Sequence, residues 1–316
     1  MAVCICTFGR TSRLTALLDL VAAQENLPPE IGQIGLVVVD NNTRPEASAP
    51  VHDWAHRAGV VVQYVHVPAR GFAQARNAAL ARAAEVSELA ALIDDDEVPS
   101  KGWLADLLAC RGRTGAPIVI GPVVPEYSPK TPRWIQEGQF FYPPQRRADG
   151  DLLDEGITGN ALLHLPDIVA SGLRFDERFS KSGGEDQLFF REARAAGLEI
   201  RYCAGAIVTE AVALERARVV YLLKREFRKG NTLGLLAAQH PELGEARIRR
   251  LAAAAKWASS GALRMLIGPI ANFAGSRGQP RARAEAVRGA LELARAAGMV
   301  AGLAGWCYDF YALNSP

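Results

Sequence analysis

The first hundred residues alternate between short apolar runs and helical patterns, and this alternation constrains the fold more than any other feature. The segments 12–25 and 72–85 carry apolar or alanine residues at helical spacing. Before, between and after these segments, four short apolar runs have the pattern of buried strands: residues 2–8, 34–40, 61–67 and 89–96. Strands that alternate with helices form mostly parallel sheets covered on both faces. We therefore predict an α/β fold built on a mostly parallel central sheet.

Polar residues end the predicted strands. Thr7 closes the first, Asp40 the second, and the acids at 94–96 the fourth. In open α/β sheets, ligands bind just beyond the carboxyl ends of the strands. We therefore expect Thr7, Asp40 and the acids at 94–96 to converge on one crevice.

The stretch "ALIDDDEVP" places four acids in a row, Asp94 to Glu97. Carboxylates at i and i+2 can share a hard divalent cation, which leaves coordination positions open for phosphate oxygens. A solvated turn is the plainer interpretation. The string "DDDEV" also fits the motif of haloacid-dehalogenase-like phosphatases, with Asp94 as nucleophile and Asp96 as acid. That motif normally sits on the first strand of its domain, whereas three predicted strands precede it here.

Composition and charge narrow the classes of function. Hydrophobic residues make up 49% of the 316 residues, enough for a sizeable core, and the net charge is only +2. We therefore predict no nucleic-acid partner, since such domains are strongly basic. The odd, scattered set of five cysteines favours reduced thiols, and no secretory signal pattern opens the sequence. We expect a cytoplasmic protein.

The second half of the sequence is harder to interpret. Residues 98–159 are rich in proline and aromatics, so we predict structure that is mostly irregular and partly functional. A strand is predicted over 200–208, and helices dominate after about residue 217. The stretches 257–275 and 298–313 are moderately apolar, and basic residues flank the first. They suit helices lying on the inner face of a cell membrane, or helices packed on protein.

Several motifs in this order resemble the inverting family 2 glycosyltransferases, most of all bacterial exopolysaccharide transferases of the succinoglycan type. They are "CICTFGR" (4–10), "VVVDNNT" (37–43), "GFAQARNAAL" (71–80), "LIDDDEVP" (92–99), "GGEDQLFFR" (183–191) and "REFRKGN" (225–231). The resemblance implies a GT-A domain over 1–235 and a helical C-terminal extension over 236–316. It also implies an enzyme that moves a sugar from a nucleotide-sugar, of the UDP type, to a saccharide acceptor, which we expect to be lipid-linked. The alternatives are the phosphatase and a non-catalytic nucleotide-sugar-binding protein.

The resemblance also implies roles for individual residues. Asp94 and Asp96 would bind a divalent metal, Mn²⁺ or Mg²⁺, and Asp186 would be the general base with Glu185 beside it. Asp40 would accept a hydrogen bond from the base of the donor, usually uracil. The donor would further contact Thr7, Phe8, Arg10, Arg76, Asn77, Asp94 and Asp95. Glu210 stands where many members have a metal-binding histidine, so it is a candidate ligand.

Overall fold

The structure is a computed structural model that describes residues 1–316 except 70, 142–146, 181–182, 244–246, 274–279 and 310–316. The chain forms two compact units. Unit 1 consists of Met1–Val124, Gln145–Ser180 and Glu185–Ala211, and unit 2 of Pro125–Pro144, Lys181–Gly184 and Val212–Pro316. The domain boundary predicted at residue 235 falls inside a helix, Val219–Gln239. The division into a transferase domain and an extension there stays a prediction.

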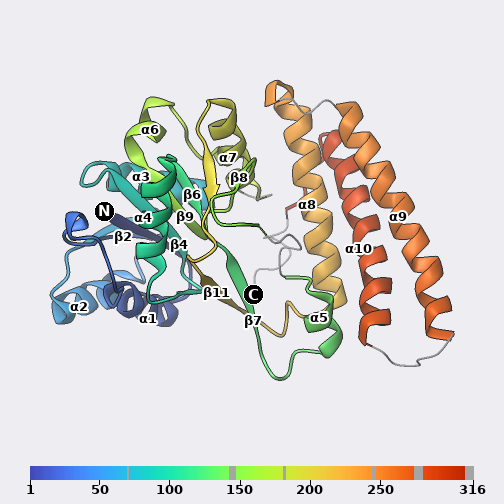
Figure 1. Ribbon diagram of the computed structural model, residues 1–316, viewed down its shortest axis with the longest axis horizontal. Helices are drawn as coiled ribbons and strands as arrows, with labels where there is room; N and C mark the ends of the chain where they lie inside the picture. The colour runs from blue at the N-terminus through green and yellow to red at the C-terminus, as the bar shows by residue number, and fades with distance from the viewer. Residues whose placement is uncertain (70, 142–146, 181–182, 244–246, 274–279, 310–316) are drawn as a thin grey trace. The chain divides into compact units, whose positions relative to one another are not determined.

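Unit 1 is built on an eight-stranded sheet with the order β3-β2-β1-β4-β9-β6-β10-β8 (Figure 1). Its strands are β1 (Ala2–Thr7), β2 (Gly35–Asp40), β3 (Val62–His66), β4 (Leu89–Asp94), β6 (Ile118–Ile120), β8 (Leu152–Leu153), β9 (Asn160–His164) and β10 (Ile200–Tyr202). Strands β9 and β8 run antiparallel to their neighbours, and the other pairs are parallel. The predicted mostly parallel sheet is therefore confirmed.

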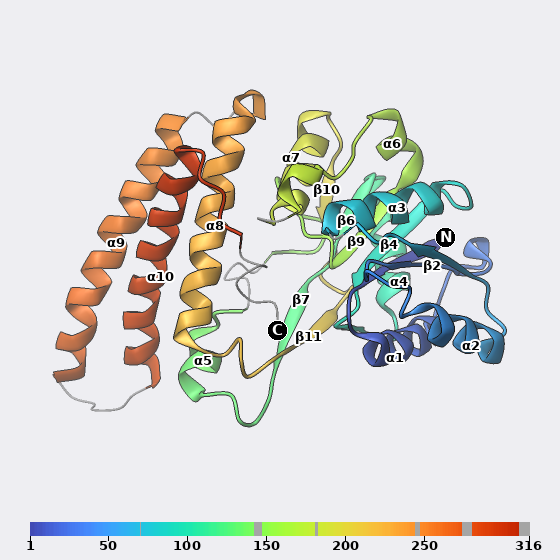
Figure 2. The ribbon, with the colours of Figure 1, turned by 180° about the vertical axis from the view of Figure 1, so that it is seen from behind.

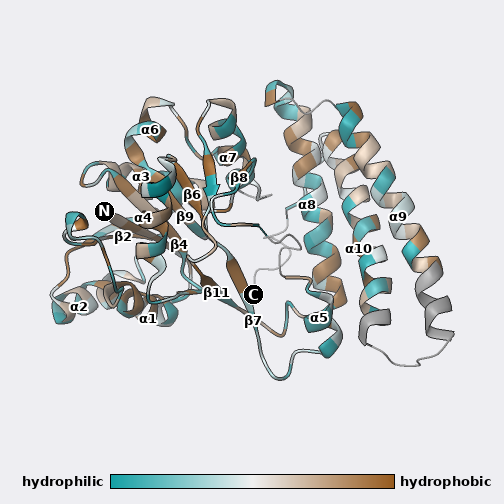
Figure 3. Cartoon of the chain, in the orientation of Figure 1, coloured by the Kyte–Doolittle hydropathy of each residue, from teal (hydrophilic) through white to brown (hydrophobic). Residues whose placement is uncertain are grey.

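Helices cover both faces of this sheet. They are α1 (Thr11–Ala22), α2 (Ser48–Ala58), α3 (Phe72–Ala84), α4 (Trp103–Thr114), α6 (Leu165–Ala170) and α7 (Glu185–Ala195). Because side chains alternate along a strand, Val3 and Ile5 of β1 pack with α1, α2 and α4, while Ala2 and Cys4 pack with α3, α6 and α7. Figure 3 shows the strands between these layers as mainly hydrophobic. Burial on both faces explains why the strands appear in the sequence as continuous apolar runs.

A second sheet has the order β5-β11-β7, from β5 (Glu97–Pro99), β11 (Val208–Val212) and β7 (Val123–Tyr127). Strand β5 follows the acidic turn at once, and it pairs antiparallel with β11 so that Glu97 faces Glu210. This small sheet therefore brings a residue more than a hundred positions away next to the acids.

Unit 2 is mainly helical, with α5 (Arg133–Gly138), α8 (Val219–Gln239), α9 (Arg247–Phe273) and α10 (Pro280–Leu303), and α10 packs against both α8 and α9 (Figure 2). Glycines let α8 and α10 approach closely. A Cβ atom on Gly230 or Gly234 of α8 would lie 2.0 or 2.3 Å from a backbone oxygen of α10. A Cβ atom on Gly298 or Gly302 of α10 would likewise lie 2.0 or 2.2 Å from a backbone oxygen of α8. Each pair is spaced by four residues, so the two glycine stripes face each other.

Two secondary-structure predictions are wrong. Residues 98–159 contain α4, β6, β7 and α5, whereas we predicted mostly irregular structure. Strand β6 has only three residues, and α4 begins at Trp103 only a few residues after the acidic turn, so neither gives a long periodic signal. The single strand predicted over 200–208 is two strands, β10 and β11, which belong to different sheets. Among the described residues, no helix is both long and apolar enough to cross a membrane.

Candidate active site

The carboxyl ends of the parallel strands meet as predicted. Thr7 of β1 is the register partner of Asp40 in β2, and Cys6 is the partner of Asp94 in β4. Residues from three separate segments are therefore neighbours at one sheet edge.

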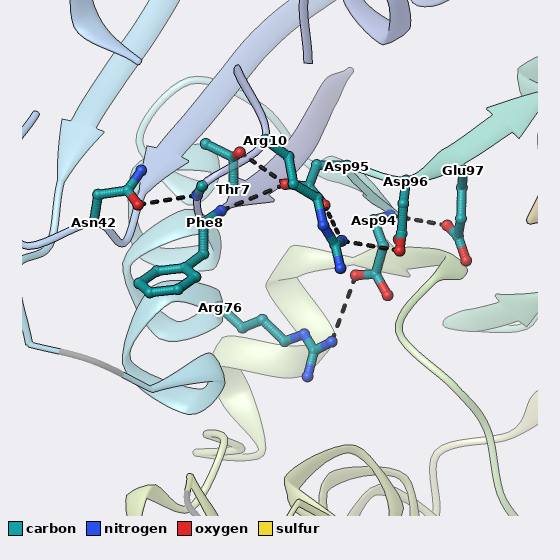
Figure 4. A network of polar contacts seen from close by, with 10 residues as sticks. Thr7, Phe8, Arg10, Asn42, Arg76, Asp94, Asp95, Asp96 and Glu97 are labelled. Atoms are coloured by element: carbon teal, nitrogen blue, oxygen red, sulfur yellow. Dashed lines mark hydrogen bonds and ion pairs between the residues drawn. The ribbon is translucent and has the colours of Figure 1, made fainter. Parts of the chain in front are cut away.

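Asp95 holds this edge together. Its buried carboxylate accepts hydrogen bonds from Thr7 Oγ1 at 2.8 Å, from the Phe8 amide at 3.4 Å and from Arg10 Nη1 at 2.8 Å (Figure 4). Burial raises the pKa of Asp95, although Arg10 and Thr7 act to lower it. These contacts bind the acidic turn to the loop after β1, so Thr7, Arg10 and Asp95 fix the position of the turn.

Asp94 and Asp96 flank this anchor and are more open. Arg10 Nη1 also pairs with Asp96 at 2.9 Å, and Arg76 Nη2 lies 3.5 Å from Asp94 Oδ1. The side chain of Asp94 is 44% exposed and that of Asp96 is 14% exposed, against 6% for Asp95. Exposure therefore singles out Asp94 and Asp96, rather than Asp95, as the carboxylates that a ligand can reach.

The acids crowd one another in a way that fits a metal ion. The pKa of Asp94 is raised, first by the enclosure of the site and then by the neighbouring charges of Asp96, Asp95 and Glu210, while Arg76 opposes the shift. A divalent cation would relieve this repulsion. Carboxylate oxygens such as those of Asp94 and Asp96 suit Mg²⁺ or Mn²⁺, although the oxygens of Asp94, Asp96 and Glu210 do not all lie within 4.8 Å of one another in this structure.

Glu97 fixes the turn from the other side. Its Oε2 atom accepts a hydrogen bond from the Asp94 amide at 2.9 Å, and the residue is 5% exposed. Burial and then the charge of Asp94 raise the pKa of Glu97 well above its ordinary value. A Cβ atom on Gly159 would lie 2.3 Å from Glu97 Oε1, so this carboxyl group has a tightly fitted place.

Arg76 links the acidic turn to Glu185, the residue before the predicted base. Its Nη1 donates to Glu185 Oε1 at 2.5 Å, and its Nη2 faces Asp94. Burial acts to lower the pKa of Arg76, but Asp94, Glu185 and Asp186 together raise it. Glu185 is buried, while Asp186 is partly exposed, and its Oδ1 atom accepts a hydrogen bond from the Gln187 amide at 2.8 Å. Of the two acids, Asp186 is the more exposed, and its role as the base stays a prediction.

Asp40 lies at the predicted sheet edge, with its carboxylate enclosed by its own loop. It is fully buried, and its two oxygens accept from the Asn42 amide, Asn42 Nδ2, the Ala47 amide and Tyr64 Oη at 2.7–2.9 Å. Burial acts to raise its pKa, but these hydrogen bonds lower it. The geometry is that of an anchor for the loop after β2, with both oxygens already used by the chain. Contact with a nucleotide base stays a prediction.

Three asparagines at this edge hydrogen-bond to the chain itself, and only Asn77 was predicted as a site residue. Asn77 is tied to Phe175 in both directions, its Nδ2 donating to the carbonyl and its Oδ1 accepting from the amide, each at 2.9 Å. Asn41 and Asn42 were not predicted. Asn41 Nδ2 donates to the Val67 and Ala69 carbonyls, while Asn42 Oδ1 accepts from the Gly9 amide at 2.9 Å. The signal for them was the pair of amides directly after a buried strand.

Phe8 is the exposed member of the set. Its side chain is 45% exposed although it is aromatic, and Figure 4 shows the ring turned away from Asp95. An exposed aromatic at the mouth of a strand-end site offers a flat surface for a planar ligand.

Among the described residues, the one group of three His, Cys, Asp or Glu side chains whose ligand atoms all lie within 4.8 Å of one another is elsewhere, at Cys110, Asp149 and Cys203. Its members are satisfied internally: the thiols donate to the Tyr202 and Asp106 carbonyls, and Asp149 accepts from the Ala204 amide and Arg113. The described thiols are all free, as predicted from their number.

The fold and the acidic strand edge together define a glycosyltransferase of the GT-A type. The architecture is that of a mannosyltransferase from Pyrobaculum calidifontis in complex with GDP-Man and Mn²⁺, with a TM-score of 0.61, 18% identity and coverage of 96% of this chain and 86% of that chain. It is also that of S. aureus TarS 1-349 in complex with UDP, with a TM-score of 0.53, 15% identity and coverage of 97% and 92%.

The sequence gives the family. The model of glycosyl transferase family 2 matches residues 2–166, and the chain belongs to this family. It is also 36% identical over 235 residues to the succinoglycan biosynthesis protein ExoM of Rhizobium meliloti. The aligned region covers 74% of each protein. The family and the relative support an enzyme of polysaccharide biosynthesis. Family membership decides between the two interpretations of "DDDEV" in favour of glycosyl transfer over phosphatase chemistry.

Proposed function

We propose that this glycosyltransferase moves a sugar from a nucleotide-diphosphate-sugar to a saccharide acceptor with inversion at the anomeric carbon. The observation that carries the proposal is the Arg76 guanidinium, which contacts both Asp94 of the acidic turn and Glu185 at the start of α7. This contact keeps Asp186, the next residue, beside the acids that would hold the donor.

The donor end of the site has the chemistry that a nucleotide-sugar needs. Asp94 and Asp96, with Glu210 as a further candidate, would hold a divalent metal ion, which would offset negative charge on the leaving diphosphate. Phe8 offers a ring for the base to stack on. Solved relatives of the same fold bind GDP-Man with Mn²⁺, UDP and UDP-GlcNAc. We favour a UDP-sugar as the donor.

Asp186 is the proposed base. The acceptor hydroxyl oxygen attacks the anomeric carbon from the face opposite the diphosphate, the bond to the diphosphate breaks, and the hydroxyl proton passes to the Asp186 carboxylate. One base suffices, because no covalent intermediate forms. Arg76 holds Glu185 by an ion pair, which leaves Asp186 as the available carboxylate of the two.

The relative of succinoglycan biosynthesis points to the acceptor class. We propose that the acceptor is the growing saccharide of a surface or exopolysaccharide, carried on a lipid at the cytoplasmic face of the membrane. The test is to incubate the protein with UDP- and GDP-sugars, Mn²⁺ and lipid-linked oligosaccharides, and to determine the anomeric configuration of any product by NMR. A product of inverted configuration is expected. A product of retained configuration, or transfer that is unchanged in Asp186→Asn, would refute the mechanism.

A further inference from the structure

The outward face of α9 has the opposite character from that of a helix facing water. Helices on a protein surface normally turn charged residues outward. Here the exposed side chains include Ile248 at 79%, Leu251 at 50%, Leu263 at 57% and Leu266 at 68%. Exposed alanines at 252, 255 and 262 lie on the same side, because spacings of three and seven residues return to one face of a helix. We name the stripe from Ile248 to Leu266 the outer face of α9.

The inner face of α9 already has its partner. Gly261 packs against Gly289 of α10, where an added Cβ would lie 2.6 Å from the Gly289 oxygen. Arg264 pairs with Glu285 and with Glu292 of α10, and the Arg295 guanidinium of α10 lies over the Trp257 ring, 5.1 Å from its centroid. Packing within the helix bundle therefore accounts for one side of α9 and leaves the outer face uncovered by α8 and α10.

The charged side chains of α9 are all of one sign. The sequence of the helix holds five cations, Arg247, Arg249, Arg250, Lys256 and Arg264, and no aspartate or glutamate. Arg249 and Lys256 are exposed and lie along one border of the outer face, and Arg247 along the other. An apolar stripe bordered by cations is the pattern of a helix that lies in the interface of an anionic bilayer.

We propose that the outer face of α9 docks on an anionic lipid surface, with the helix lying in the plane of the interface. A helix of this length extends for about 40 Å along the surface. The described residues contain no helix suited to crossing a membrane, which agrees with lying on it. A second copy of the chain is a poorer occupant, since two-fold pairing would bring Arg249 and Lys256 against the same cations. This docking goes beyond the transfer reaction and does not depend on it.

The test is co-sedimentation of the full chain with vesicles of phosphatidylcholine, with and without phosphatidylglycerol. We expect binding to the anionic vesicles that weakens with added salt. The triple variant Ile248→Gln, Leu263→Gln, Leu266→Gln should bind the anionic vesicles at least about tenfold more weakly, because it loses apolar area from the interface. Glutamine is a good helix former, so the helix should persist.

A matched control variant changes three valines outside α9 that are equally open, Val61, Val86 and Val169, which are 65%, 56% and 65% exposed. Replacing these with glutamine should leave vesicle binding unchanged. A second variant, Arg249→Gln with Lys256→Gln, should lose most of the preference for anionic over neutral vesicles. Far-UV circular dichroism checks that each variant is folded.

Three results would overturn the proposal. The first is a wild-type protein that stays in the supernatant with anionic vesicles. The second is an α9 triple variant that binds them as well as the valine control does. The third is a wild-type dimer that becomes a monomer in the α9 variant on size-exclusion chromatography, without vesicle binding, which would assign the outer face to a second copy.

Discussion

The Nη1 atom of Arg76 donates a hydrogen bond to Glu185 Oε1 at 2.5 Å, and this contact joins α3 to the first residue of α7. Both side chains are nearly buried, at 10% and 6% exposure. The Nη2 atom of the same guanidinium lies 3.5 Å from Asp94 Oδ1. One buried cation therefore joins a carboxylate of the acidic turn to the segment that carries the proposed base, although the two lie about ninety positions apart in the sequence.

Asp186 and Glu185 should behave differently when their charge is removed. In Asp186→Asn we expect turnover to fall by roughly 10²- to 10⁴-fold while donor affinity stays near that of the wild type, since only the proton acceptor is lost. In Glu185→Gln we expect a lower melting temperature, because the buried Arg76 keeps the more distant Asp94 as a charged partner but loses Glu185, at a cost of up to roughly 3–5 kcal/mol. Steady-state kinetics, donor titration and thermal melts on both variants distinguish the roles. Equal effects on turnover and stability in both would argue against this division.

Tyr64→Phe tests whether Asp40 is an anchor. The substitution removes the hydroxyl that donates to Asp40 Oδ2 at 2.7 Å, so we expect a loss of roughly 1.5 kcal/mol of stability with donor affinity unchanged. The pKa of Asp40 is lowered in the fold, so its contribution is present above the ordinary aspartate pKa and is lost as pH falls. Urea unfolding measures the effect. If Asp40→Asn instead abolishes UDP binding without loss of stability, the base contact implied by the family resemblance is correct.

The glycine stripes between α8 and α10 should tolerate no methyl group. In Gly298→Ala the new Cβ would lie 2.0 Å from the Phe227 backbone oxygen, so the helices must separate. We expect a loss of roughly 2–4 kcal/mol, within the range for overpacked or disrupted cores. The matched control is Gly112→Ala in α4, where nothing lies within 4 Å of the added atom, and which should stabilise by up to about 1 kcal/mol. Thermal melts of the two variants give the comparison.

Glu226 should make unit 2 sensitive to acid. Burial acts to raise its pKa, but Lys229, Arg295 and Arg225 outweigh it and lower the pKa from 4.5 to about 2. A lowered pKa means stability that is present above pH 4.5 and is lost as pH falls toward 2. Glu226→Gln should therefore cost roughly 3 kcal/mol at pH 7 and much less near pH 3.

The control for this pH dependence is Glu199→Gln. Glu199 pairs with Arg201 but its side chain is 47% exposed, so its removal should change stability by less than about 1 kcal/mol at either pH. Urea unfolding at the two pH values tests both variants. A Glu226→Gln protein as stable as the wild type at pH 7 would show that its three cationic neighbours do not need the carboxylate.

The strands that hold the site were predictable because each is buried on both faces and stands between helices. The acids after β4 and the loop after β1 were therefore assigned correctly to one edge. What the sequence did not reveal is how the carboxylates divide the work. Nothing in "DDDE" distinguishes Asp95, which is bound by Thr7 and Arg10, from the more exposed Asp94. That difference arises from contacts between segments more than eighty residues apart.

The same limit explains Asp40 and the region 98–159. A carboxylate at the end of a strand looks the same in the sequence whether it faces a ligand or accepts amides from its own loop, as Asp40 does. Helix α4 and the short strand β6 depend on tertiary packing, because neither has a periodic pattern in the sequence that is long enough to predict it. The glycine spacing in α8 and α10 was visible but acquires meaning only when the two helices are seen together.

The central claim is that Asp94 and Asp96 hold a nucleotide diphosphate through a divalent metal. Calorimetric titration of UDP and GDP into the protein, first with Mn²⁺ and then with EDTA, tests it most directly. We predict binding of one nucleotide that requires the metal and is lost in Asp96→Asn. Binding that is equally tight in EDTA, or that survives in Asp96→Asn, would contradict the claim.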